Sequence, residues 1–218
     1  MNIRKYGIEL ERLTENDIEL VRKMRNKKEI SKTMFFQEKI SKTQQKKWFH
    51  SIDNPYNYYF LIKHNQKKIG LVHGKILSYS NKTAEGGIFI WEKSVWGTHI
   101  PVIVSICMAD ITFLILKMEK TNAEIRMDNP RAIEYNMKLG YEITEELKTE
   151  KKLRMQLTKD NYFEKANSIR QMVKNISRDQ SEISWGDIEF RNEMPAHLYA
   201  GLPMYLQQKI EDYKVSKK

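Results

Sequence analysis

The stretch that most constrains the fold is residues 129–141, which read Asn-Pro-Arg-Ala-Ile-Glu-Tyr-Asn-Met-Lys-Leu-Gly-Tyr. Asp128 or Asn129 can cap a helix here, and Pro130 fits its first turn, where the missing amide hydrogen needs no partner. Gly140 suits the left-handed residue that ends a helix. The apolar residues of this helix fall on adjacent turns, so one side can pack on a sheet. The capping pattern alone is compatible with many folds.

Hydrophobic periodicity and turn residues divide the rest of the chain into further elements. Strands are expected at residues 8–13, 58–63, 68–77, 84–91, 122–127 and 152–157. Helices are expected at 18–26, 41–52 and 101–116, besides the one after Asn129. The second of these opens on Ser-Lys-Thr-Gln, which resembles a capping box. Strands and helices in this order indicate an α/β protein.

The string Asn-x-Arg-Ala-Ile followed by Lys-Leu-Gly-aromatic resembles a signature of the GNAT acetyltransferases. That superfamily moves an acetyl group from acetyl-CoA to an amine. The resemblance implies an α/β (α+β) GNAT fold, with a central mixed, mostly antiparallel twisted sheet flanked by helices. It also implies acetyl-CoA as co-substrate and a GNAT-like acyltransferase domain at residues 1–158.

Residues 159–218 lie beyond the usual core of that family and are expected to form a helical C-terminal extension. Apolar spacing predicts helices at 160–176 and within 194–213. The extension can pack on the core, form a homodimer contact or cover the acceptor site, and the sequence does not choose among these.

Composition limits the partners. Lysine and arginine number 38 against 28 acidic residues, a formal charge of +10 that favours an anionic partner or acceptor, although scattered lysines often only solubilise a surface. The sole cysteine excludes a disulfide within the chain, and the five histidines are isolated, so no metal is expected. The charged N-terminus and the short apolar stretch 101–116 predict a cytoplasmic protein without a membrane contact. No motif supports nucleic-acid binding.

Glu85 stands near the start of the strand expected at 84–91. In many GNAT proteins a glutamate at this place acts as general base, and half-burial would raise its pKa toward neutrality. A solvent-facing glutamate at a strand end is the alternative. The resemblance further implies that this strand splays to bind the pantetheine arm, which makes Phe89 and Ile90 candidate cofactor contacts.

The loop at 96–101 corresponds to the pyrophosphate loop of the family, where backbone amides at a helix start hold phosphates. The resemblance implies cofactor-binding roles for Trp96, Gly97, Thr98, His99 and Ile100. Histidine and proline replace the two glycine positions of the family pattern. These replacements predict either weaker cofactor binding or a non-catalytic GNAT-like binding protein. For the tryptophan, packing in the core is the favoured interpretation.

In the helix after Asn129, the family often has a tyrosine that protonates the leaving thiolate. This chain has Asn136 at that position and Tyr135 one place earlier, so both are catalytic candidates. Asn136 can also donate a hydrogen bond to sulfur as a cofactor contact. Asn129 is expected to hold the pantetheine or a backbone carbonyl, and Arg131 to meet a coenzyme phosphate.

The acceptor site is expected at the N-terminal helices, with Arg25, Asn26, Phe35 and Phe36 joining Glu85 as substrate-binding candidates. These segments look like those of GNAT proteins that acetylate amino sugar nucleotides of flagellar and surface-polysaccharide pathways. Similar starts occur in ribosomal-protein N-terminal and spermidine acetyltransferases, so a protein N-terminus and a polyamine stay open as acceptors. Core and solvated surface are equally compatible with these side chains.

Overall fold

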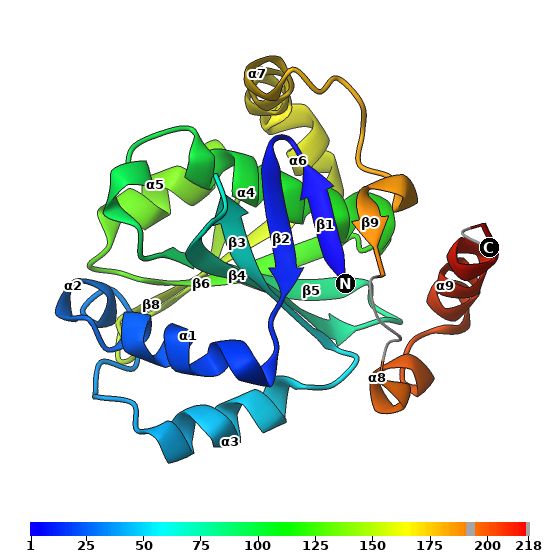
Figure 1. Ribbon diagram of the computed structural model, residues 1–218. Coiled ribbons are helices and arrows are strands. Elements are labelled where there is room, and N and C mark those ends of the chain that lie inside the picture. The colour runs from blue at the N-terminus through cyan, green and yellow to red at the C-terminus, as the bar shows by residue number, and fades with distance from the viewer. Residues whose placement is uncertain (191–194, 217–218) are drawn as a thin grey trace.

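The computed structural model describes residues 1–190 and 195–216, and a twisted sheet forms its centre (Figure 1). Within these residues the sheet has nine strands in the order β7-β8-β6-β5-β4-β3-β2-β1-β9. The strands are β1 (Asn2–Lys5), β2 (Ile8–Arg12), β3 (Asn57–His64), β4 (Lys67–Ser78), β5 (Thr83–Ile90), β6 (Lys120–Arg126), β7 (Glu142–Leu147), β8 (Lys152–Thr158) and β9 (Ile188–Glu189). All neighbouring pairs are antiparallel except β5 and β6, which run parallel.

The parallel pair β5 and β6 is joined only at its beginning. Its register runs from Thr83 opposite Lys120 to Glu85 opposite Asn122, and the two strands then separate. The other edge of β5 stays paired with β4 as far as Ile90. The sheet therefore opens into a fork between β5 and β6.

Helices cover both faces of the sheet (Figure 1). On one face lie α1 (Ile18–Arg25), α2 (Lys28–Ser31) and α3 (Lys42–Ile52). On the other lie α4 (Ile100–Asp110), α5 (Pro130–Lys138), α6 (Lys159–Lys165) and α7 (Asn167–Ser177). A π-helical turn, Ile111–Ile115, extends α4, and α8 (Ala196–Ala200) and α9 (Met204–Ser216) lie to one side. The mixed, mostly antiparallel sheet flanked by helices confirms the expected fold class.

Two apolar clusters fill the spaces between the sheet and its helices. Strand β3 contributes to both, because successive side chains of a strand point to opposite faces. Phe60 and Ile62 belong to the cluster beneath α4, α6 and α7, whereas Leu61 belongs to the cluster beneath α1 and α3. The same alternation assigns the residues of β5 to the two faces.

The helix signals expected from the sequence are confirmed. Ser41 Oγ accepts from the amide of Gln44 at 3.2 Å, and the Gln44 side chain accepts from the Ser41 amide at 2.8 Å. Asn129 Oδ1 caps α5 by accepting from the Ala132 amide at 3.2 Å. Gly140 ends that helix in the left-handed region with φ of +93°.

The structure also differs from the expectations in places. Strands β1, β7 and β9 were not expected, so the C-terminal extension is not purely helical. The single helix expected at 160–176 is two helices that meet at Ala166. The single helix expected at 101–116 is α4 followed by the π-helical turn. The helix expected within 194–213 divides into α8 and α9 because Gly201 and Pro203 interrupt it, and Met194 lies outside the described residues.

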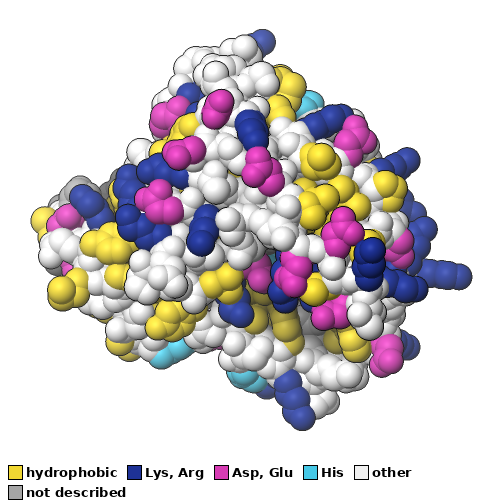
Figure 2. All heavy atoms as spheres, turned by 180° about the vertical axis from the view of Figure 1, so that it is seen from behind, with side chains coloured by type: hydrophobic (Ala, Val, Ile, Leu, Met, Phe, Trp, Pro, Cys, Tyr) yellow, Lys and Arg dark blue, Asp and Glu magenta, His cyan; other side chains and the backbone are white. Residues whose placement is uncertain are grey.

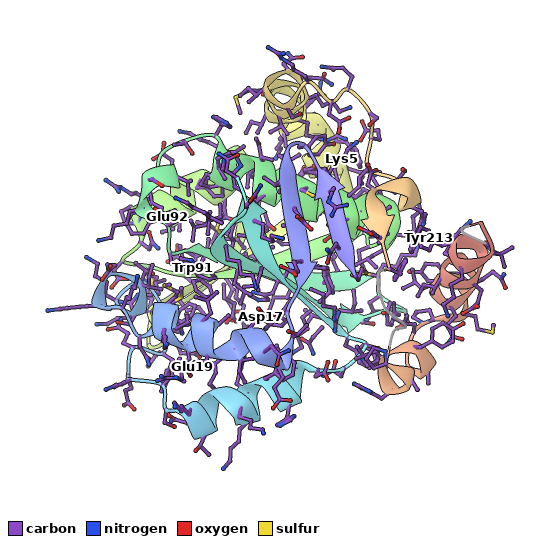
Figure 3. All side chains as sticks on the ribbon, viewed as in Figure 1. Lys5, Asp17, Glu19, Trp91, Glu92 and Tyr213 are labelled. Atoms are coloured by element: carbon purple, nitrogen blue, oxygen red, sulfur yellow. The ribbon has the colours of Figure 1, made fainter. Side chains whose placement is uncertain are left out.

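The extension packs on the core, one of the three options that the sequence left open. The buried carboxylate of Asp110 in α4 accepts from the hydroxyls of Tyr6 and Tyr162, each at 2.8 Å. The buried Lys5, labelled on β1 in Figure 3, pairs with Asp179 at 3.0 Å. Tyr213 lies on the side of α9 that faces the sheet. A domain boundary at residue 158 stays a prediction.

Candidate active site

A cavity of about 560 Å³ lies at the fork between β5 and β6. Its outer side faces α2 and the loop after it, where the lining residues are Glu29, Ile30, Thr33, Met34 and Phe35. Its inner side faces α4 and α5, where the lining residues include Ser105, Ala109, Asn129, Ala132, Tyr135 and Asn136. The fork thus connects two faces of the sheet through one cavity.

Glu85 lines the cavity at the point where β5 and β6 separate. It is half-buried, and no hydrogen bond or ion pair within the described residues engages its carboxylate. Burial, followed by the charge of Glu124, raises its pKa. A carboxylate with a raised pKa and free oxygens is suited to take a proton near neutral pH.

Glu124 lies across the fork on β6 and is held differently. Lys152 contacts its carboxylate at 2.9 Å and Arg154 contacts it at 3.3 Å. Burial opposes ionisation, but these two cations hold its pKa below the ordinary value. Of the two carboxylates, Glu124 therefore stays charged while Glu85 is the more basic.

Tyr135 and Asn136 line the inner side from α5. The Tyr135 hydroxyl lies 2.7 Å from Ser105 Oγ and 3.0 Å from the carbonyl oxygen of Pro101, so it is tied to α4. Burial raises the pKa of Tyr135 to about 12. Asn136 donates from Nδ2 to the carbonyl of Ala132 at 2.8 Å and keeps further donor and acceptor capacity.

The loop before α4 has the exposed amides that an anion needs. Gly97 is left-handed with φ of +75°, and an added Cβ there would meet nothing within 4 Å. No acceptor among the described residues engages the amides of Gly97 and His99. The Ile100 amide is already bound by Thr98 Oγ1 at 3.2 Å, and Pro101 has none.

The remaining cofactor candidates are spread over this region. Phe89, Ile90 and Asn129 line the cavity, whereas Arg131 is exposed outside its lining. Trp96 also lines the cavity and is 44% exposed, with its indole N–H donating to the Ile90 carbonyl at 3.0 Å. The interpretation that this tryptophan packs in the core was wrong, because the N–H anchors the ring over the strand end.

The acceptor candidates divide into two groups. Phe35 lines the outer side with Glu85, and Lys152 lies 5.2 Å from the centre of its ring. Phe36 is exposed but outside the lining. Asn26 instead anchors the loop between α2 and α3, since its side chain bonds both the amide and the carbonyl of residue 40, at 2.8 and 2.9 Å.

Arg25 is also outside the cavity lining. Its guanidinium lies 5.7 Å from the ring centre of Phe89, and its buried Nη1 has no hydrogen-bond partner in the described residues. Burial lowers the pKa of this group. Arg25 therefore supports Phe89 from beneath and does not reach the space where an acceptor would lie.

Sequence reasoning missed several residues of the site. His73 on β4 lines the cavity, and Tyr59 on β3, outside the lining, stacks on it with ring centres 4.7 Å apart and nearly parallel planes. Burial lowers the pKa of His73 to about 4, so the imidazole is neutral. Tyr58 and Tyr141 enter the lining from β3 and from the end of α5. Register between strands sets these positions, and no local pattern signals it.

The surface charge does not gather into one basic patch on the face shown in Figure 2, where Lys and Arg side chains alternate with Asp and Glu. No helix in the described part of the chain is long and apolar enough to cross a membrane. Across residues 1–190 and 195–216, no group of three His, Cys, Asp or Glu side chains could hold a metal ion.

Acetyl-CoA fits the inner side of this cavity. The exposed amides of Gly97 and His99 suit its phosphates, and the fork leaves unpaired main chain of β5 for its pantetheine arm. A sheet that opens between two parallel strands around such a cavity has the architecture of the acyl-transfer class that the sequence resembles.

A family model described as "Acetyltransferase (GNAT) domain" matches residues 8–142, more than half of the chain. The chain therefore belongs to the GNAT acetyltransferase family. It is an acetyl-CoA-dependent N-acetyltransferase, with acetyl-CoA as co-substrate.

Solved structures agree in fold. A spermidine N-acetyltransferase from Vibrio cholerae, in complex with CoA and spermine, superposes with a TM-score of 0.64 at 20% identity, over 73% of this chain and 99% of that one. A domain from Methanocaldococcus jannaschii DSM 2661 gives 0.60 at 24% identity, over 69% and 97%. At these identities the likeness shows the fold alone. A search of curated proteins found no match.

Proposed function

We propose that this N-acetyltransferase acetylates a primary amine of a small, cationic acceptor of the linear polyamine class. The observation that carries the proposal is the Glu85 carboxylate, which lines the cavity and has no ion pair among the described residues. Glu29 and Glu124 also line the cavity, but lysine side chains pair with both. The one Lys or Arg in the described lining is Arg126, and its guanidinium is paired with Asp128, so the lining keeps a free carboxylate and no free lysine or arginine.

The residues at the fork supply the roles that the reaction requires. Glu85 takes the proton from the amine as the nitrogen forms its bond to the acyl carbon and the carbon–sulfur bond breaks. Asn136 donates a hydrogen bond toward the departing sulfur, and water or Tyr135 returns the proton to it. A thiol has a reference pKa of about 8.5, so this last step needs no strong acid.

The lining supports a cationic acceptor better than the anionic one expected from net charge. Phosphates of an amino sugar nucleotide need unpaired cations, whereas Arg25 lies beneath Phe89 and Arg126 is paired. Phe35 adds an aromatic face to the lining, which attracts ammonium groups as well as sugars. The neighbour from Vibrio cholerae, solved with CoA and spermine, is consistent with this choice.

The proposal is tested first by calorimetry with acetyl-CoA, then by thiol release with spermidine, glucosamine, a nucleotide-linked amino sugar and a peptide with a free N-terminus. We expect spermidine to give the highest kcat/KM, with a value that falls as salt screens the carboxylates. Preference for the nucleotide-linked sugar would refute the cationic acceptor. A folded protein that binds no acetyl-CoA would support a non-catalytic binding protein instead.

Two variants make the test specific to the cavity. Glu124→Gln removes one lining carboxylate and should raise the KM for spermidine more than the KM for glucosamine, which carries one charge. Glu134→Gln is the matched control, because that glutamate is exposed on α5 and its one ion pair among the described residues is with Lys138, at 2.7 Å. An equal effect of both changes would mean that net charge, and not this site, attracts the amine.

A further inference from the structure

Three residues in register across the sheet place an imidazole near Glu85. Tyr59 of β3 pairs with His73 of β4, and His73 pairs with Gly87 of β5. All three belong to the face of the sheet that carries Glu85, because Gly87 follows Glu85 by two residues on the same strand. His73 and Gly87 line the cavity, yet the proposed chemistry at Glu85 uses neither of them.

Gly87 leaves the room that the imidazole occupies. A Cβ added at Gly87 would lie 2.6 Å from His73 Cε1, 3.3 Å from Nε2 and 3.4 Å from Nδ1. The ring edge that carries both nitrogens therefore lies over this glycine. A larger residue at position 87 would push the imidazole away from β5.

Aromatic stacking holds the imidazole in this place. The ring of Tyr59 stacks on it with an angle of 8° between the planes, and Trp48 of α3 meets the Tyr59 ring edge-on, with centres 5.4 Å apart. A ring that is packed in this way has little freedom to turn. Its position over Gly87 is therefore set before a ligand binds.

The nitrogens of His73 are available to a ligand. No hydrogen bond among the described residues engages either of them, and neither is fully enclosed without a partner. The side chain is only partly buried and lines the cavity, so the ring edge can be reached from there. Burial lowers the pKa of His73 to about 4, so near pH 7 one nitrogen of the neutral ring offers a lone pair.

Charge favours one direction for a cationic chain that is anchored at Glu85. Across the fork, β6 and β8 carry basic side chains on the same face, namely Arg126, Lys152 and Arg154. Lys75, opposite Glu85 on β4, is exposed and outside the cavity lining. Along β5 within the cavity, the imidazole is neutral and can accept a hydrogen bond from an ammonium group without repelling its charge.

The spacing along β5 selects the length of that chain. Two residues of a strand advance roughly 6–7 Å, which is the separation of Glu85 and Gly87 along the strand. Nitrogens joined by three or four methylene groups lie roughly 5–6 Å apart in an extended chain, from the standard bond lengths. One nitrogen can therefore be held at Glu85 while the next contacts the imidazole over Gly87.

We propose that His73 determines acceptor specificity by accepting a hydrogen bond from the second nitrogen of a diamine or polyamine whose first nitrogen reacts at Glu85. The acceptors that it selects have three or four methylene groups between these nitrogens. The inference rests on the proposed function, from which it takes the cationic acceptor, and it adds the residue and the nitrogen spacing that recognise this acceptor.

A series of chain lengths tests the spacing on the unaltered full chain, with acetyl-CoA as donor and thiol release as the signal. The terminal diamines are diaminopropane, putrescine, cadaverine and diaminohexane, and butylamine is the monoamine that matches putrescine. We expect putrescine to exceed butylamine in kcat/KM by about tenfold or more, the effect of one hydrogen bond to a charged group. The diamines with three or four methylene groups should exceed the two longer ones.

Two substitutions separate the hydrogen bond from the packing. His73→Phe keeps a ring that can stack on Tyr59 but has no nitrogen, so the putrescine-to-butylamine ratio should fall about tenfold through KM, with butylamine little changed. His73→Gln supplies another acceptor and should recover part of the ratio. His50→Phe is the control, because His50 is exposed on α3 outside the cavity lining.

The outcomes distinguish this inference from the proposed function. Equal kcat/KM for putrescine and butylamine, or a ratio unchanged in His73→Phe, would overturn the role of His73, and a preference for spermidine over the sugars would leave the proposed function standing. An equal loss for all amines in His73→Phe would mean that the histidine only packs. An optimum at cadaverine or diaminohexane would overturn the spacing, and this result needs no variant. A protein that acetylates no cationic amine would overturn both proposals.

Discussion

Replacing Glu85 by glutamine tests the general base most directly. Glutamine has the same shape, and Glu85 has no hydrogen bond or ion pair in the described structure to lose. We therefore expect the free energy of unfolding to change by less than about 0.5 kcal/mol. Loss of a general base lowers the rate by roughly 10²–10⁴-fold, which is about 2.7–5.4 kcal/mol in activation free energy. The contrast between the two free energies identifies the role.

The pH profile gives the sharper assay, with spermidine as the amine and thiol release as the signal. Burial and the charge of Glu124 raise the pKa of Glu85. A base acts in its deprotonated form, so kcat/KM should fall as the pH drops through that raised pKa, and Glu85→Gln should lack this limb. Glu124→Gln should move the limb to lower pH, because the like charge is gone and Lys152 and Arg154 each lose one of their carboxylate partners. An unchanged rate and profile in Glu85→Gln would refute the assignment.

Three further predictions concern the framework around the site. Tyr162→Phe removes a hydroxyl that donates to the buried Asp110, so urea denaturation should show a loss of roughly 1.5–3 kcal/mol. Tyr205→Phe, whose hydroxyl is exposed, should cost about 0.5 kcal/mol, and equal losses would contradict the buried network. Asn26→Ala frees the loop at residue 40 and should raise the KM for the amine more than it lowers kcat. Gly140→Ala should lower the melting temperature, since the left-handed conformation costs about 1–2 kcal/mol and the new Cβ would lie 3.1 Å from the Asn161 carbonyl.

Local signals predicted most of the core of the fold. The capping residues Ser41 and Asn129 act as expected. For strands with strong apolar alternation, the expected bounds lie within a few residues of the observed ones. Strand β7 was missed because its residues are almost all exposed, so Glu142–Leu147 has no apolar pattern to recognise. The two-residue β9 has too little sequence to signal a strand.

The candidate site was predicted less completely, for a physical reason. The family resemblance located Glu85, Tyr135 and Asn136 along the chain, and the structure places all three around one cavity. The orientation of Trp96 depends on a hydrogen bond to Ile90. The places of Tyr58 and His73 in the lining depend on how β3 and β4 pair, and pairing between strands is a long-range property.

The two edges of the sheet differ in how they prevent self-association. Strand β7 has exposed charged side chains at one edge, where Glu142 and Glu145 are ion-paired, and a second strand that paired there would disturb these contacts. At the other edge, the short β9 covers β1, pairing with Asn2 and Ile3. A chain shortened to residue 158 would bare that edge and also lose the Tyr162 hydroxyl bound to Asp110. Such a fragment should associate through β1. The C-terminal segment therefore protects the sheet from aggregation as well as packing on the core.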